Sequence, residues 1–300
     1  VDHLDIWIGE HVMEIGLGLD GSLKLSIDEE SEISIEAARL GYTSIWTPEH
    51  PGYDAFQICT SRWIASKAVV ETGLETGISV SPVALRTPIS LAMSAGTMSA
   101  VTRGRFTLGI GSGSIHASGG RLVYGTPPGS TLNVMKEYLT ALRGLLSGKQ
   151  VTLDGDAFQL YKASLAISPP PSTPVYLGAL GPRMLRLGGK FADGIALNWC
   201  TSEQLDWSRH EVAIGAKQEG RDPKSVKLTE YIRICVDDDL ELAKRALAKA
   251  ALGYALGPAR ATARDRSLGY RAHFERMGFT DTLLELDSMR DLGSSLDDLA

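Results

Sequence analysis

Short apolar runs alternate with stretches that carry apolar residues at helical spacing along most of the chain. Such runs predict buried strands, and the helical stretches between them predict a parallel sheet whose strands are joined by helices. The runs predicted as strands are Leu4–Ile8, Thr43–Trp46, Gly77–Val83, Arg105–Ile110, a run that ends at Gly178, Gly194–Trp199 and Lys227–Val236.

The stretch Thr76–Ser114 predicts one complete strand–helix–strand unit. Its helix has Thr87 as N-cap and Pro88 at its first position, and Gly104 stops it. An apolar stripe lets this helix lie on a parallel sheet, and the stripe consists of Leu91, Ala95 and Met98. Small residues end both strands. Because ligands of parallel sheets and barrels bind at the carboxyl ends of strands, the unit predicts the floor of a cofactor site.

Other helix boundaries follow from capping residues. Ser26 precedes Glu29 by three residues, which is the spacing of a capping box, and the helix that it starts is predicted to stop at Gly41. Thr201 with Gln204 has the same spacing. We expect a helix after each of these caps.

The alternation breaks after the fourth predicted strand. Residues 116–130 are rich in Gly, Pro and Ser and predict a long loop over the site, followed by an amphipathic helix that ends at Gly148. Val151–Leu160 predicts a hairpin because it holds an Asp-Gly turn. We expect residues 115–173 to form an insertion in a single domain that spans residues 1–300.

The length of 300 residues suits one (β/α)8 barrel of about 250 residues with insertions. Only seven parallel strands are predicted, and from Gly253 onward the pattern is helical or irregular. Asp281–Ala300, in particular, shows helical spacing. Because a closed barrel needs a strand between the first and the seventh, we expect an incomplete barrel and a chain that stops before its natural end.

Composition narrows the class of function. A formal net charge of −6 argues against nucleic acid as the partner, and the sequence holds no apolar run long enough to span a membrane. The three cysteines have no CxxC spacing, which indicates a reducing compartment, hence the cytoplasm, and no structural zinc. The sequence also lacks an HExxH motif, so we expect no metal.

The glycine-rich end of the fourth strand, Gly109-Ile-Gly-Ser-Gly-Ser114, allows three interpretations. A dinucleotide fingerprint needs a third glycine where Ser114 stands, and it needs a helix directly afterwards. The run can also be a barrel loop that binds nothing. We favour a loop under a flavin-like cofactor, because the run ends a predicted barrel strand.

The segment Gly178-Ala-Leu-Gly-Pro-Arg183 ends a strand and starts a helix at Pro182. Backbone N–H groups at a helix start, with the positive end of the helix dipole, form an anion site, and Arg183 adds a charge. The alternative is an ordinary short turn with Arg183 in solvent. We favour a phosphate site, since phosphate sites of barrels commonly use a late loop.

Glu49 and His50 follow the strand Thr43–Trp46 at its carboxyl end. A single histidine is more often a surface or core residue than a catalytic one. Its place at the end of a barrel strand, next to an acidic residue, makes a role in proton transfer about as probable as a structural one. His116 could line the site from the long loop.

Four stretches resemble the bacterial-luciferase-like flavin and deazaflavin oxidoreductases. They are LGYTSIWTPEH, TGISVSPV with RTPISLA, SAVTRGRFTLGIGSG, and PVYLGALGPRMLRL with FADGIALNW. They lie in order over about 200 residues, which makes the resemblance specific. In particular, the sequence resembles the branch that uses the 5-deazaflavin coenzyme F420, which includes methylenetetrahydromethanopterin reductase and the deazaflavin-dependent glucose-6-phosphate and alcohol dehydrogenases.

The resemblance implies a (β/α)8 barrel, often dimeric, and a role for each matching residue. Glu49 and His50 match an acidic–His pair that faces the deazaflavin, and Ser79-Val80 match a non-proline cis peptide behind its ring. The cofactor is lined by Gly109, Gly111 and Ser112. The loop that holds its phosphate matches Ala179, Leu180, Gly181, Pro182, Arg183 and Met184.

The chain departs from the methanopterin reductases at the end of the first predicted strand, where Trp7 stands in place of their glutamate. The expected activity is therefore hydride transfer between the deazaflavin and a small-molecule substrate that is not identified. Two alternatives stay open: an FMN-dependent monooxygenase of the same family, and a barrel that binds flavin without catalysis. The resemblance also suggests a homodimer.

Overall fold

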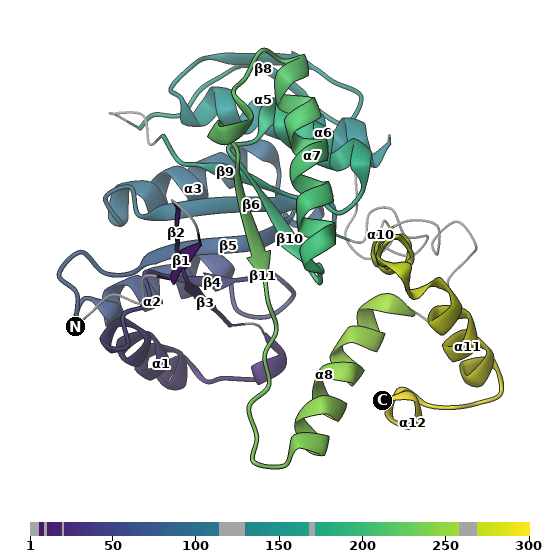
Figure 1. Ribbon diagram of the computed structural model, residues 1–300. Helices are drawn as coiled ribbons and strands as arrows, with labels where there is room; N and C mark the ends of the chain where they lie inside the picture. The colour runs from purple at the N-terminus through teal and green to yellow at the C-terminus, as the bar shows by residue number, and fades with distance from the viewer. Residues whose placement is uncertain (1–5, 9–10, 20, 114–129, 168–171, 258–268) are drawn as a thin grey trace.

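The computed structural model describes residues 6–8, 11–19, 21–113, 130–167, 172–257 and 269–300. Seven parallel strands, adjacent in the order of the chain, form the main sheet, which curls into a nearly closed barrel surrounded by helices (Figure 1). These strands are β3 (Gly16–Gly18), β4 (Ser44–Thr47), β5 (Glu75–Pro82), β6 (Phe106–Gly111), β9 (Val175–Gly178), β10 (Gly194–Asn198) and β11 (Lys227–Tyr231). The predicted α/β barrel and its count of seven strands are confirmed.

Helices follow most of the strands. They are η1 (Gly21–Leu23), α1 (Ile27–Arg39), α2 (Ala55–Ser66), η2 (Val83–Leu85), α3 (Pro88–Val101), α5 (Thr131–Leu146), α6 (Pro182–Phe191), α7 (Ser202–Gln218), η3 (Pro223–Ser225), α8 (Leu240–Ala255), α10 (Gly269–Phe274), the π-helical η4 (Glu275–Phe279), α11 (Thr280–Asp291) and α12 (Leu296–Leu299). The capping box of Ser26 and Glu29 is present, and Thr87 caps α3 as predicted. Thr201 caps α7 by accepting from the Gln204 N–H.

The first barrel strand differs from the prediction. Ile6–Ile8 forms β1, which pairs antiparallel with β2 (His11–Met13) in a separate sheet, and β3 is the strand that pairs with β4. Positions 16 and 18 of β3 require glycine. A Cβ at Gly16 would clash with the Trp46 ring, and one at Gly18 would overlap the Tyr231 ring. Trp7 therefore does not lie at the end of the first barrel strand, where it was compared with the glutamate of the methanopterin reductases.

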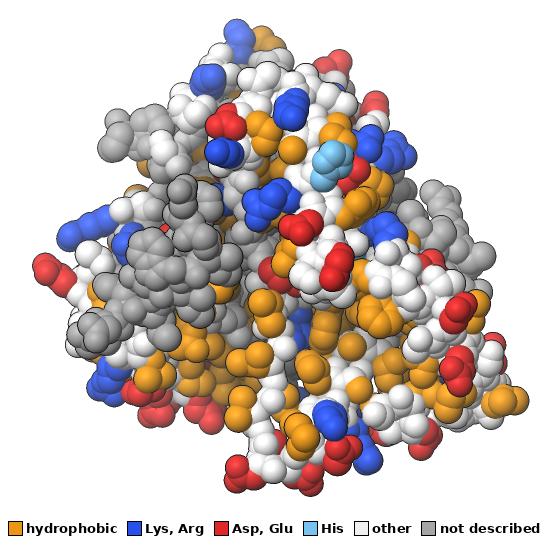
Figure 2. All heavy atoms as spheres, viewed as in Figure 1, with side chains coloured by type: hydrophobic (Ala, Val, Ile, Leu, Met, Phe, Trp, Pro, Cys, Tyr) orange, Lys and Arg blue, Asp and Glu red, His pale blue; other side chains and the backbone are white. Residues whose placement is uncertain are grey.

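The seventh strand is shorter than predicted, because β11 ends at Tyr231. The residues beyond it keep alternating apolar side chains but lie in solvent: Ile232, Ile234 and Val236 are 74%, 79% and 90% exposed. Hydrophobic side chains are visible along this lower face of the molecule (Figure 2). No eighth strand follows in the described residues after β11, as predicted, and the end of the natural chain stays a prediction.

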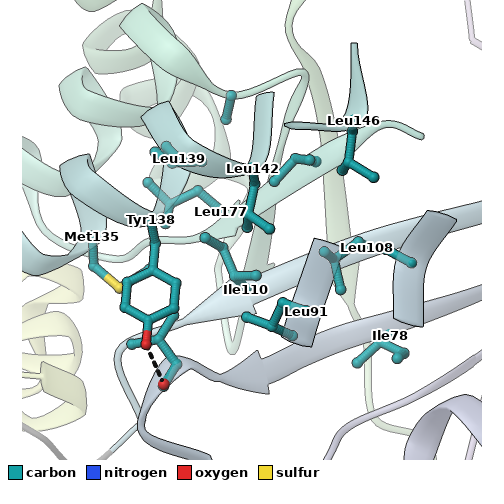
Figure 3. Close-up of a cluster of buried hydrophobic side chains, with 14 of the residues drawn as sticks. Ile78, Leu91, Leu108, Ile110, Met135, Tyr138, Leu139, Leu142, Leu146 and Leu177 are labelled. Atoms are coloured by element: carbon teal, nitrogen blue, oxygen red, sulfur yellow. Dashed lines mark hydrogen bonds between the residues drawn. The ribbon is translucent and has the colours of Figure 1, made fainter. Parts of the chain in front are cut away.

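The main core lies between the strands and the helices α3, α5 and α6. Outward-facing strand residues such as Leu108 and Leu177 meet Leu91 of α3 and Leu142 of α5, all with 0% exposure (Figure 3). Burying one leucine fully contributes about 1.5–3 kcal/mol, so this layer supplies much of the driving force for folding. Helix α5 is part of this core, although its residues fall in the stretch predicted as an insertion.

Two parts lie outside the main sheet. The hairpin of β7 (Val151–Asp154) and β8 (Gln159–Ala163) forms a sheet of its own, which confirms that prediction. The helices α8, α11 and α12 share a small core of their own around Leu252 and Leu283 and lie beside the barrel (Figure 1). The predicted loop 116–130 falls almost entirely outside the described residues.

Candidate active site

The carboxyl ends of β4 and β5 bring two groups of predicted site residues together. The backbone N–H of Glu49 donates a hydrogen bond to the carbonyl oxygen of Val80, at 3.2 Å. The Ser79–Val80 peptide is cis, as the resemblance implied. Glu49 and Val80 therefore occupy one edge of the barrel, where parallel barrels bind their ligands.

The carboxylate of Glu49 is buried and fully engaged. Ser81 donates to its Oε2 atom, and Arg86 donates to Oε1 through Nε, at 2.9 Å, and through Nη2. The carboxylate therefore has hydrogen-bond partners on both oxygens. These contacts fix the position of the Glu49 side chain.

Arg86 also binds Asp54, the N-cap of α2, and its guanidinium lies 4.8 Å from the centroid of the Phe56 ring. Burial alone would lower the pKa of Arg86, but the hydrogen bonds and charges of Glu49 and Asp54 outweigh burial and raise it. For Asp54, burial would raise the pKa, but Arg86 and the capped N–H groups lower it. Arg86 thus stays charged and ties the end of β4 to the start of α2.

Tyr138 supports the backbone that carries Arg86. Its hydroxyl oxygen is 2.8 Å from the Arg86 carbonyl and 2.9 Å from the Val83 carbonyl, and it lies at the edge of the core cluster (Figure 3). Burial raises the pKa of Tyr138 to about 12, so the hydroxyl keeps its proton for these acceptors. The sequence analysis missed both residues, because a single Arg or Tyr between core positions carries no motif.

His50 is exposed whereas Glu49 is buried, so the two residues of the predicted pair lie in different environments. Its Nδ1 atom is 3.2 Å from the Pro51 carbonyl, and its ring packs on Gly21 and Gly52. A carbonyl oxygen only accepts, so this contact is a hydrogen bond in the tautomer that carries its proton on Nδ1, and Nε2 is the acceptor in that tautomer. No hydrogen-bond partner of Nε2 occurs among the described residues. Nε2 lies against Gly21, where an added Cβ would be 2.0 Å from it.

Val80 projects over glycines of two neighbouring strands. A Cβ added to Gly111 would overlap Val80 Cγ2, and one added to Gly109 or Gly178 would lie 3.3 or 3.2 Å from Val80 Cγ1. Gly111 is therefore needed to admit the Val80 side chain, whereas at Gly109 the closest atom is the Ile78 carbonyl oxygen, 2.3 Å from an added Cβ. Ser112 directly follows this strand end and is half-buried, as is Val80. Val80 and its glycines form a small apolar surface at the mouth of the barrel, which we call the Val80 platform.

The predicted phosphate loop lies at the start of α6. Gly181 is the N-cap and has no side-chain cap, and a Cβ there would meet open space. Arg183 is exposed, whereas Met184 packs against the main core. Ala179 is buried and bonded to β10 through its N–H, while the Leu180 carbonyl accepts from Arg276 Nη2 at 2.8 Å. The loop leaves the first N–H groups of α6 available to an anion.

A second polar group surrounds the ends of β10 and β11, and the sequence analysis did not find it. Asn198 donates to the Tyr270 hydroxyl at 2.7 Å and accepts from Arg233. Arg233 also donates to the Tyr254 hydroxyl at 3.1 Å. Only Asn198 could have been found from the sequence, because a polar residue at a strand end suggests a site. Tyr254, Tyr270 and Arg233 lie in segments whose patterns predicted only a strand or helices.

Cys200 and His273 lie on the outer side of this group, with 3.8 Å between Sγ and Nε2. Burial raises the pKa of Cys200 to about 12 and lowers that of His273 to about 4. Both groups are therefore neutral near pH 7, and the thiol is not activated as a nucleophile. The described residues contain no cluster of His, Cys, Asp and Glu that could hold a metal, and none of their helices is long and apolar enough to cross a membrane.

The family model described as "Luciferase-like monooxygenase" matches residues 11–292. A 5,10-methylenetetrahydromethanopterin reductase of Methanolobus tindarius is 30% identical over 210 residues, which cover 70% of this chain and 62% of that protein. An F420-dependent glucose-6-phosphate dehydrogenase of Intrasporangium calvum is 28% identical over 180 residues, covering 56% of this chain and 52% of that protein. The chain therefore spans less than two thirds of the length of either relative.

The barrel is similar to that of a solved structure, the coenzyme F420-dependent tetrahydromethanopterin reductase from Methanopyrus kandleri. The TM-score is 0.72 at 19% identity, and the match covers 95% of this chain and 80% of that chain. This likeness establishes the fold.

Proposed function

Because the chain belongs to the family of luciferase-like monooxygenases, we propose that it is an oxidoreductase that transfers a hydride between the 5-deazaflavin coenzyme F420 and a small organic substrate. The relative from Intrasporangium calvum is named as F420-dependent, and the one from Methanolobus tindarius as a reductase. One observation carries the proposal: the exposed His50 imidazole lies at the edge of the barrel that Val80 also occupies, and its Nε2 has no hydrogen-bond partner among the described residues.

The residues at this edge fit the coenzyme. The Val80 platform offers an apolar surface for a flat ring, and Ser79, Gly109, Gly111 and Ser112 border it. At the start of α6, the residues from Ala179 to Met184 would hold the phosphate through the uncapped N–H groups. Arg183 is exposed there and can add its charge.

Two residues of the chain have defined tasks in this proposal. When bound, the coenzyme supplies a carbon that accepts or donates a hydride. His50 Nε2 takes the hydroxyl proton of an alcohol substrate as the hydride leaves the carbon, and returns it in the reverse direction. Arg86 and Ser81 fix the Glu49 carboxylate, so that the Glu49 backbone N–H can donate its hydrogen bond to the Val80 carbonyl oxygen.

An FMN-dependent monooxygenase is the second candidate, and the description of the family model favours it. The same Val80 platform and the same start of α6 would hold FMN, which also combines a flat ring with a phosphate. A non-catalytic flavin-binding barrel is the third candidate.

Titration of the purified protein with F420 and, separately, with FMN tests the proposal, with binding followed by calorimetry. Tight binding of F420 and weak binding of FMN is the expected result. Tight binding of FMN alone supports the monooxygenase, and binding of neither contradicts all three candidates. Reduction of bound F420 by candidate alcohols then separates an enzyme from a non-catalytic barrel.

The wider setting is also part of the proposal. The three cysteines are free, which suits a reducing compartment such as the cytoplasm. Contacts from Asn198 to Tyr270 and from Arg233 to Tyr254 join the C-terminal helices to the barrel, which supports a single domain over residues 1–300. The homodimer rests on the family resemblance alone.

A further inference from the structure

Arg233 is held in an aromatic surround just beyond the end of β11. Its guanidinium carbon lies 4.6 Å from the centroid of the Tyr231 ring, 4.8 Å from that of Trp199 and 5.1 Å from that of Tyr254. Hydrogen bonds to Asn198 and Tyr254 fix its orientation. Because these contacts already fix the guanidinium, it loses little more conformational freedom when it binds a ligand.

Most of the hydrogen-bonding capacity of Arg233 is unused. A guanidinium has five N–H donors, and the described residues accept from Arg233 at two places, Asn198 and Tyr254. No ion pair joins Arg233 to a carboxylate in the part of the chain that the structure describes, whereas the buried Arg62 has one and the buried Arg271 has two. Burial raises the pKa of the neighbouring Glu230, although the charge of Arg233 acts in the opposite direction.

Arg233 and His50 lie at the same edge of the barrel. His50 follows the carboxyl end of β4 and Arg233 follows that of β11, and the strands of the main sheet pair in parallel. The Tyr231 ring near the guanidinium packs on Gly18 of β3, and the His50 ring packs on Gly21. Among the described residues, no strand lies between β3 and β11.

We propose that Arg233 binds an anionic group, a carboxylate or a phosphate, of the substrate whose reacting carbon meets His50. The proposal rests on the function proposed above and adds a substrate class to it. The unused N–H donors match two oxygens of such a group. The anion could instead belong to the coenzyme. We assign it to the substrate because the start of α6 already provides for the coenzyme phosphate.

The test uses inorganic phosphate as the probe, titrated calorimetrically into the protein with and without saturating F420. Arg233→Gln should weaken phosphate binding by about tenfold or more, as expected for loss of a charge-assisted pair. Arg233→Lys should recover part of the affinity, because it keeps the charge but not the fork. Arg209→Gln is the matched control, since Arg209 is an exposed arginine of α7. Circular dichroism checks that each variant is folded.

The outcomes separate this inference from the proposed function. Phosphate binding that is equal in wild type and Arg233→Gln overturns the inference, whether or not F420 binds. A second result would also overturn the inference: Arg233→Gln loses F420 affinity, and phosphate no longer binds once F420 is bound. That result would assign the anion to the coenzyme. Phosphate binding that depends on Arg233 and persists in the F420 complex supports it. Failure of F420 to bind, with phosphate binding still dependent on Arg233, removes the proposed function but leaves the anion site.

Discussion

The backbone N–H of Glu49 and the carbonyl oxygen of Val80 are joined by a hydrogen bond of 3.2 Å between the ends of β4 and β5. Arg86 and Ser81 hold the Glu49 carboxylate by hydrogen bonds, while the Glu49 backbone holds Val80. The position of Val80 therefore depends on Arg86, although Arg86 need not touch a ligand. Arg86 is therefore a structural support of the candidate site.

Arg86→Gln should destabilise the protein by about 2–4 kcal/mol, because it leaves the buried carboxylate of Glu49 without its charged partner. Urea unfolding measures the change. Arg39→Gln is the control, since its ion pair with Glu36 has both side chains more than half exposed and should contribute less than about 1 kcal/mol. Equal effects of the two substitutions would show that Arg86 is not a support.

His50→Ala should lower kcat by about 100-fold or more while F420 affinity is largely kept, because it removes the proton acceptor and no contact of the Val80 platform. Steady-state kinetics with calorimetric binding measures both quantities. His210→Ala, on the exposed side of α7, is the control. Loss of cofactor binding with the chemical step intact would make His50 a wall of the pocket only.

Gly111→Ala should weaken F420 binding by about tenfold, because the added Cβ would displace the Val80 side chain that forms the platform. Gly253→Ala adds the same methyl group in open space within α8 and should stabilise that helix by about 0.5–1 kcal/mol without an effect on binding. If both variants bind F420 as wild type does, the Val80 platform does not contact the ring.

Folding stability should fall as the pH drops from about 6.5 to about 4, in part through His273, whose pKa burial lowers to about 4. In this window the unfolded chain binds a proton at His273 that the folded chain does not, so the loss reaches about 3 kcal/mol at pH 4 and grows no further below it. Urea unfolding of wild type and His273→Gln over this range measures the component. His210→Gln should leave the pH dependence unchanged. A wild-type curve parallel to that of His273→Gln would contradict the prediction.

The sequence predicted the barrel because its buried strands and helix caps are local signals. It failed at β3, where Gly-Leu-Gly has little hydrophobic pattern, since the side chains of Trp46 and Tyr231 fill the space that larger residues would take. It also extended the last strand too far, because alternating apolar residues after Tyr231 imitate a strand where no partner pairs with them.

The candidate site was predicted where a motif marks a strand end, as at His50, Val80 and Gly181. Arg86 and Arg233 were missed because their importance comes from partners distant in sequence: Arg86 is 37 residues from Glu49, and Arg233 is 35 from Asn198. The sequence likewise gave no sign that Glu49 is buried while the adjacent His50 is exposed.

The separate core of the C-terminal helices has a consequence for how the molecule opens. Leu252 and Leu283 belong to a cluster that shares no member with the main core, so α8 and α11 form a cooperative unit that can unfold while the barrel ladder stays intact. Amide hydrogens of α8 should then exchange with solvent faster than those of β6. Arg233 is hydrogen-bonded to Tyr254 of α8, so a ligand bound to Arg233 should slow amide exchange in α8. The exchange rate of α8 would then report whether a ligand is bound at the barrel edge.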